Sequence, residues 1–157
     1  MKPLILPLLL VLAACGRSPE EATKKLAEMQ VPVSPEALIA KTKDTKNQDV
    51  AKMLVQAGVD PNARQENGMT ALMSAAFNGQ HDVARALLEK GAQVNDDAKG
   101  FTALSLAVER NDKAMAELLL KHGAEARSRP SGGLSALEKA QQQNKPDMVK
   151  LLENAAK

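Results

Sequence analysis

Few side chains in this sequence are of the types that catalyse reactions or bind metals. His81 and His122 are the only histidines, too few for a histidine-rich metal site. Both fall at the ends of expected helices, where surface histidines are common. No glycine-rich phosphate loop follows a strand, and helix faces and caps account for the serines of interest, Ser74, Ser105 and Ser135. The sequence therefore predicts a protein with no enzymatic activity, cofactor, metal site or small-molecule substrate.

The N-terminus carries the pattern of an export signal. Lys2 precedes an apolar run over residues 3–14, which is shorter than the roughly 20 residues of a membrane-spanning helix. The segment Leu12-Ala13-Ala14-Cys15 resembles the lipobox of bacterial lipoproteins, which implies cleavage of residues 1–14 and acylation of Cys15. The alternatives are a cysteine that ends the signal of a soluble protein by chance, or an apolar segment buried in the fold.

Cys15 is the only cysteine, so no disulfide can form within one chain. More than one acyl chain would attach it stably to a membrane, because a single chain binds only marginally. Gly16 follows it in place of Asp, as in lipoproteins that are sorted to the outer membrane. The resemblance thus implies a lipid anchor in the cell envelope, at the outer membrane and facing the periplasm.

Residues 15–33 are expected to be the lipidated cysteine and a flexible tether. Ser18 followed by Pro19 predicts a short helix start, but pairs such as Glu20 with Lys24 stabilise a helix by only tenths of a kcal/mol. We therefore expect a spacer that holds the rest of the chain off the membrane. Docking of this segment through Leu26 and Met29 is the alternative.

From residue 34 onward the sequence repeats itself. Thr70-Ala71-Leu72 recurs as Thr102-Ala103-Leu104 and as Ser135-Ala136-Leu137, steps of 32 and 33 residues. A glycine stands two residues before each of these segments. A further set of glycines with the same spacing ends each unit: Gly58, Gly91 and Gly123.

Apolar residues within one unit fall at helical spacing. Leu72, Ala75 and Ala76 form one stripe, and a second follows at Val83, Leu87 and Leu88. The polar segment 78–81 between them suits a tight turn, and Gly91 suits a helix C-cap. Each unit is therefore predicted to be a helix, a turn and a second helix.

This period and helix start resemble the ankyrin repeat, a β-turn followed by two antiparallel helices. The resemblance implies an all-α solenoid of about four repeats joined by short β-hairpin loops. The expected repeats are 34–62, 63–95, 96–127 and 128–157, with the first and last acting as polar caps. The chain departs from the family where Pro is commonest, at Ala71, Ala103 and Ala136, and where His is commonest, at Met73, Ser105 and Glu138.

Composition agrees with such an array. The 157 residues carry a formal charge of +2, without the clustered basic faces of nucleic-acid-binding proteins, so no nucleic-acid partner is expected. Trp and Tyr are absent and Phe occurs twice. A globular core would normally contain more aromatic residues, whereas stacked Ala/Leu helix pairs do not need them.

In ankyrin-like proteins the hairpins and the exposed face of each first helix bind partners. The resemblance therefore implies an apolar ridge of Met69, Phe77, Phe101 and Leu134. The polar residues expected to surround it are Glu66, Asn67, Asn78, Lys99, Glu109 and Arg110. The alternative is that the four apolar side chains only fill space between neighbouring hairpins.

The favoured function is a non-enzymatic adaptor or scaffold lipoprotein that binds an unidentified protein. The second is an inhibitor or immunity protein against a toxin or hydrolase that reaches the periplasm. A third is support of oxidative-stress defence, with which seven methionines are compatible.

Overall fold

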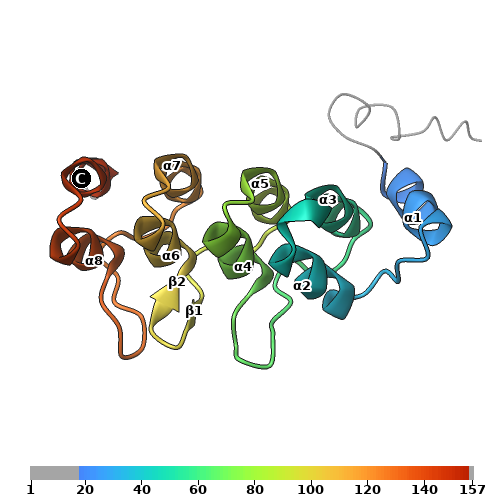
Figure 1. Ribbon diagram of the computed structural model, residues 1–157, viewed down its shortest axis with the longest axis horizontal. Coiled ribbons are helices and arrows are strands. Elements are labelled where there is room, and N and C mark those ends of the chain that lie inside the picture. The colour runs from blue at the N-terminus through green and yellow to red at the C-terminus, as the bar shows by residue number, and fades with distance from the viewer. Residues whose placement is uncertain (1–17, 156–157) are drawn as a thin grey trace, which may run out of the picture.

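A computed structural model describes residues 18–155 of the chain as two stacked rows of helices (Figure 1). The inner helices are α2 (Pro35–Lys43), α4 (Ala71–Asn78), α6 (Ala103–Glu109) and α8 (Ala136–Gln142). The outer helices are α3 (Gln48–Gln56), α5 (His81–Glu89), α7 (Lys113–Lys121) and α9 (Pro146–Ala155). A 3-10 turn, η1 (Thr45–Asn47), precedes α3, and a separate helix, α1 (Pro19–Glu28), lies at the N-terminal end. The predicted all-α repeat architecture is confirmed.

Each inner helix begins at a side-chain cap. Ser34, Thr70, Thr102 and Ser135 each accept a hydrogen bond from the backbone N–H three residues later. The turn to the outer helix needs a left-handed residue, which is Gly79 in the second repeat (φ 67°) and an asparagine in the next two. The asparagines are Asn111 and Asn144, with φ of 57° and 51°.

The core is one continuous apolar layer between the two rows. Leu72 and Leu87, which the helical stripes predicted as buried, are at most 1% exposed. The same holds for their counterparts 32 residues later, Leu104 and Leu119. Alanines such as Ala75, Ala76 and Ala107 are fully buried between them and allow neighbouring helices to approach closely. No repeat has a core of its own, so each depends on its neighbours.

Polar links join each repeat to the next. Asn62 Oδ1 accepts from Gln93 N at 2.8 Å, and Asn95 Oδ1 accepts from Glu125 N at 2.9 Å. Asn95 Nδ2 also donates to Gly123 O at 3.0 Å. Asparagines at equivalent positions in successive repeats thus form the same hydrogen bond to the repeat that follows.

The loops before the inner helices form a row of hairpins on one side of the array (Figure 1). Strands β1 (Asp97–Ala98) and β2 (Phe101–Thr102) pair in one of them, and a single bridge joins Arg64 to Thr70 in another. Two neighbouring hairpins are in close contact at Gly133, where an added Cβ would lie 2.1 Å from Gly100 O. Only glycine fits at that contact.

The segment expected to be a flexible tether is a docked helix over most of its length. In α1, Ala22 and Leu26 are fully buried against α3, so that interpretation is wrong there. Met29, the other residue expected to support docking, is 46% exposed. The first repeat was predicted to be a polar cap whose outer face meets water. Instead, helix α1 lies where the outer helix of a preceding repeat would stack and covers part of that face (Figure 1).

The export signal predicted at residues 1–14 and the roles predicted for Cys15 and Gly16 concern residues outside the described part of the chain. Within residues 18–155, no helix is long and apolar enough to cross a membrane.

The docking of α1 is testable through Leu26. We expect Leu26→Ala to weaken docking by about 2–5 kcal/mol, the usual cost of a cavity left by a buried leucine. Hydrogen exchange should then show faster exchange throughout α1. Met29→Ala is the matched control and should leave exchange unchanged; equal effects of the two changes would show that α1 is not held by its buried face.

Candidate partner-binding surface

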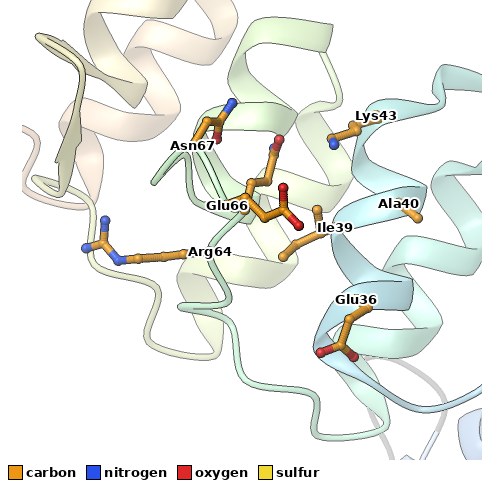
Figure 2. Close-up of a pocket in the computed structure, with 8 residues that line it drawn as sticks. Glu36, Ile39, Ala40, Lys43, Arg64, Glu66 and Asn67 are labelled. Atoms are coloured by element: carbon orange, nitrogen blue, oxygen red, sulfur yellow. The ribbon is translucent and has the colours of Figure 1, made fainter.

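The surface that the resemblance assigns to partners consists of the inner helices and the flanks of the hairpins. At its N-terminal end lies an open hollow of about 610 Å³ between α2 and residues 64–67 (Figure 2). Ile39 and Ala40 from α2 provide its apolar part, and charged side chains surround them. These are Glu36, Lys43, Arg64 and Glu66.

The hollow exists because the first repeat has no hairpin. The chain runs from α1 into α2 through residues 29–34, which leaves Ala40 exposed and Ile39 half-buried. In the second repeat the inner helix lies beneath its own hairpin, where Gln65 Nε2 donates to Ser74 Oγ at 2.5 Å. Met73 and Ser74 are accordingly buried.

The four residues of the expected ridge differ in exposure. Phe77 is 45% exposed and Leu134 37%, whereas Met69 and Phe101 are half-buried and pack against the core. Met69 precedes α4, whereas Phe77 lies near the other end of this helix, about 9 Å along the axis from its first residue, Ala71. The structure therefore separates Phe77 from the hairpin row instead of forming one continuous ridge.

Phe101 is covered by a contact that the sequence reasoning missed. Lys139 Nζ lies 4.1 Å from the centre of the Phe101 ring and donates to Glu109 Oε1 at 2.9 Å. Lys139 is only 8% exposed. Lys139 lies four residues after the capping Ser135, the same position that the buried Ser74 and Leu106 occupy in their repeats. Comparison of the repeats could therefore have predicted that Lys139 is buried.

The remaining polar residues serve different purposes. Glu66, Asn67 and Lys99 are exposed along the hairpins, and Lys99 occupies a turn with φ of 52°. Asn78 is structural, because its Nδ2 donates to Thr42 O and Ser74 O, both at 3.0 Å. The Arg110 guanidinium lies 5.9 Å from the centre of the Phe77 ring.

His81 is explained by a contact between repeats. Its Nε2 lies 2.9 Å from Asp112 Oδ1, which also accepts from Met115 N and so caps α7. Burial opposes ionisation of Asp112, but these hydrogen bonds and the nearby positive charge of Arg110 keep its pKa below the ordinary value. Over residues 18–155, no three His, Cys, Asp or Glu side chains are placed to hold a metal ion.

Glu138 has the largest pKa shift in the described part of the chain. Two hydrogen bonds from Arg129 lower the pKa of the Glu138 carboxyl to about 2, helped by donors from Ser135 N and Oγ. This carboxylate completes the capping box of α8 and holds the last hairpin to the helix that follows.

The stability of the fourth repeat should therefore depend on pH in the acidic range. Glu138 has a lower pKa in the folded chain than its ordinary 4.5, so its contribution is complete above about pH 4.5 and disappears as the pH falls toward 2. Glu138→Gln should lower the melting temperature at pH 7, with a difference from wild type that shrinks over that interval. Glu117→Gln removes a charge on α7 without touching Arg129 and is the control; a constant difference for Glu138→Gln would refute the coupling.

The chain was compared with known protein families and relatives. Three overlapping matches to the family model for ankyrin repeats in three copies cover residues 10–98, 37–130 and 94–157. A putative ankyrin repeat-containing protein of Treponema pallidum is 35% identical over 127 residues, 72% of this chain and 43% of that protein. The RelA-associated inhibitor of Mus musculus is 33% identical over 109 residues, 68% of this chain and 13% of that protein.

A third relative, the ankyrin repeat and KH domain-containing protein mask-1 of Caenorhabditis elegans, is 32% identical over 105 residues. That match covers 66% of this chain and 4% of the relative, so this chain spans less than half the length of all three proteins. Ankyrin repeats generally mediate contacts between proteins. With the repeats, caps and hairpins already described, these matches show that the chain belongs to the ankyrin-repeat family.

Proposed function

We propose that the protein is a non-enzymatic adaptor that binds another protein through its inner helices and hairpins. The observation that carries this proposal is the exposure of Phe77, a large apolar side chain that the core does not use. The hollow between α2 and residues 64–67 adds an open, partly apolar surface on the neighbouring repeat. The name of the mouse relative, RelA-associated inhibitor, is that of a protein defined by its association with another.

The same surface would serve an inhibitor of a toxin or hydrolase, and the identity of the partner distinguishes the two roles. An inhibitor requires a tight, desolvated contact, whereas an adaptor can bind reversibly.

We further propose that the adaptor is anchored in the bacterial envelope through an acylated Cys15. The support is the sequence of residues 1–15. Because α1 is docked, only residues 16 and 17 separate Cys15 from Ser18, the cap of α1, and three extended peptide steps span at most about 11 Å. The repeats would then lie next to the membrane and meet partners there, instead of being held away by a long tether.

Cross-linking in intact envelopes tests the adaptor role. Wild-type protein should capture one protein that is lost with Phe77→Ala, because that change removes the exposed ring and leaves the core intact. Met29→Ala is the control, since Met29 has nearly the same exposed fraction on α1, away from this surface. If all three forms capture the same proteins, Phe77 is not part of a binding site.

Metabolic labelling with a fatty acid tests the anchor. The wild-type protein, expressed in a bacterium, should incorporate the label and sediment with membranes, and Cys15→Ser should do neither. Mass spectrometry of the N-terminal peptide should find acylation at Cys15. An unlabelled wild-type protein recovered in the soluble fraction would exclude the lipoprotein proposal and leave the adaptor role open.

A further inference from the structure

The exposed Phe77 is not required by the repeat scaffold. It lies seven residues after the capping Thr70, and the same position holds Glu109 in the third repeat and Gln142 in the fourth. The scaffold therefore accepts an aromatic, an acidic or an amide side chain there. A structural explanation for a 45% exposed phenylalanine is correspondingly weak.

Phe77 is held in a fixed setting between two neighbouring repeats. The next residue, Asn78, donates to Thr42 O in the last turn of α2 and so fixes the end of α4 against that helix. On the other side, Arg110 caps α6 and places its guanidinium over the ring. Such pre-organised aromatic side chains lose little conformational entropy on binding.

The carboxylates nearest to this setting are already engaged. Asp44 accepts hydrogen bonds from Lys46 N and from Asn47 Nδ2. Glu109 accepts from the buried Lys139, and Asp112 caps α7 and contacts His81. Each of these acids thus already accepts hydrogen bonds from its own chain.

The cations there are in excess, and three of them are exposed without an ion pair. The ends of α2 and α6, with the side chains bonded to them, hold three acids (Asp44, Glu109 and Asp112) and six cations: Lys41, Lys43, Lys46, Arg110, Lys139 and Lys145. Part of this charge balances the negative ends of the two helices; Lys145 Nζ, for example, donates to Val108 O and Glu109 O. Lys43, Lys46 and Arg110 are exposed, and none of them forms an ion pair within residues 18–155. Lys43 ends α2 and Arg110 caps α6, whereas Lys46 lies beyond α2 in η1.

Two other acids, Glu36 and Glu66, form no ion pair within residues 18–155, and both line the hollow together with Lys43. Glu36 is in the first turn of α2 and Glu66 is on the hairpin, whereas Lys43 is at the opposite end of α2 from Glu36 (Figure 2). A segment that follows the ends of the inner helices therefore meets Lys43, Phe77 and Arg110 in three successive repeats.

We propose that this surface binds an acidic segment of the partner protein, and that the segment carries an apolar side chain between its carboxylates. We call the surface the Phe77 patch; it consists of Phe77, Lys43 and Arg110. The apolar side chain covers the Phe77 ring. The carboxylates pair with Lys43 and with Arg110, whose planar guanidinium accommodates two oxygens at once. This inference rests on the proposed protein-binding role and specifies the chemistry of the partner.

Two synthetic peptides test the proposal without knowledge of the partner. In one, Leu-Phe is flanked on both sides by glutamates; in its charge-reversed twin, lysines replace the glutamates. Each is titrated into isotope-labelled full chain carrying Cys15→Ser, and amide shifts are recorded by NMR. The acidic peptide should bind about tenfold more tightly than its twin, shift Phe77, Asn78 and Arg110, and weaken as salt is added.

Charge reversal provides the control. Lys43→Glu combined with Arg110→Glu should invert the preference, so that the lysine peptide binds more tightly. Lys90→Glu combined with Lys121→Glu makes the same change in net charge at exposed positions at the ends of the outer helices α5 and α7 and should keep the wild-type preference. Inversion by both double variants would show that net charge, and not the Phe77 patch, selects the peptide.

The remaining outcomes overturn the acidic-segment proposal. Equal binding of the twins, absence of shifts at the patch, or preference for the lysine peptide would each do so. The last outcome would leave the proposed binding role standing with a basic partner. The cross-linking comparison of Phe77→Ala with Met29→Ala tests that role separately.

Discussion

Burial of each inner helix against the next is the interaction on which the rest of this structure depends. Leu38, Leu72 and Leu104 are all but completely buried, yet no repeat encloses its own leucine without help from a neighbour. In such an array the stability is shared between repeats and the contacts between them. The hairpins and outer helices are held in place because the inner helices stack, and α1 extends the same principle by covering the free side of α3.

Polar contacts then fix how the repeats are aligned. Asn62 and Asn95 tie the end of one repeat to the next, and His81 with Asp112 does the same at the outer helices. The pair formed by Lys139 and Glu109 is largely buried and ordered further by the Phe101 ring. Removing one partner of such a pair is costly because it leaves a buried charge without compensation, so these contacts specify the alignment more than they add stability.

Residues that bind a partner can differ between repeats only at positions that the packing of the helices does not require. The position after each inner helix's core residues holds Phe77, Glu109 or Gln142 in successive repeats, while the leucine beneath is kept. In the third repeat that position is used internally, by Lys139, and in the second it is open to solvent. A scaffold of similar repeats thus acquires one distinct surface, where an exposed aromatic ring lies beside the Arg110 guanidinium.

The sequence by itself determined the period, which its repeated segments show directly. It also determined the caps, the turns and the buried stripes, because these depend on residues within one unit: Thr70 caps its own helix, and Leu72 and Leu87 belong to the same unit. Only the tertiary structure decided which apolar residues stay exposed. Burial depends on neighbours about 30 residues away, so the sequence placed Met69, Phe77, Phe101 and Leu134 in one ridge although Lys139 covers Phe101. For the same reason it did not decide that Ala22 and Leu26 dock α1 while Met29 faces solvent.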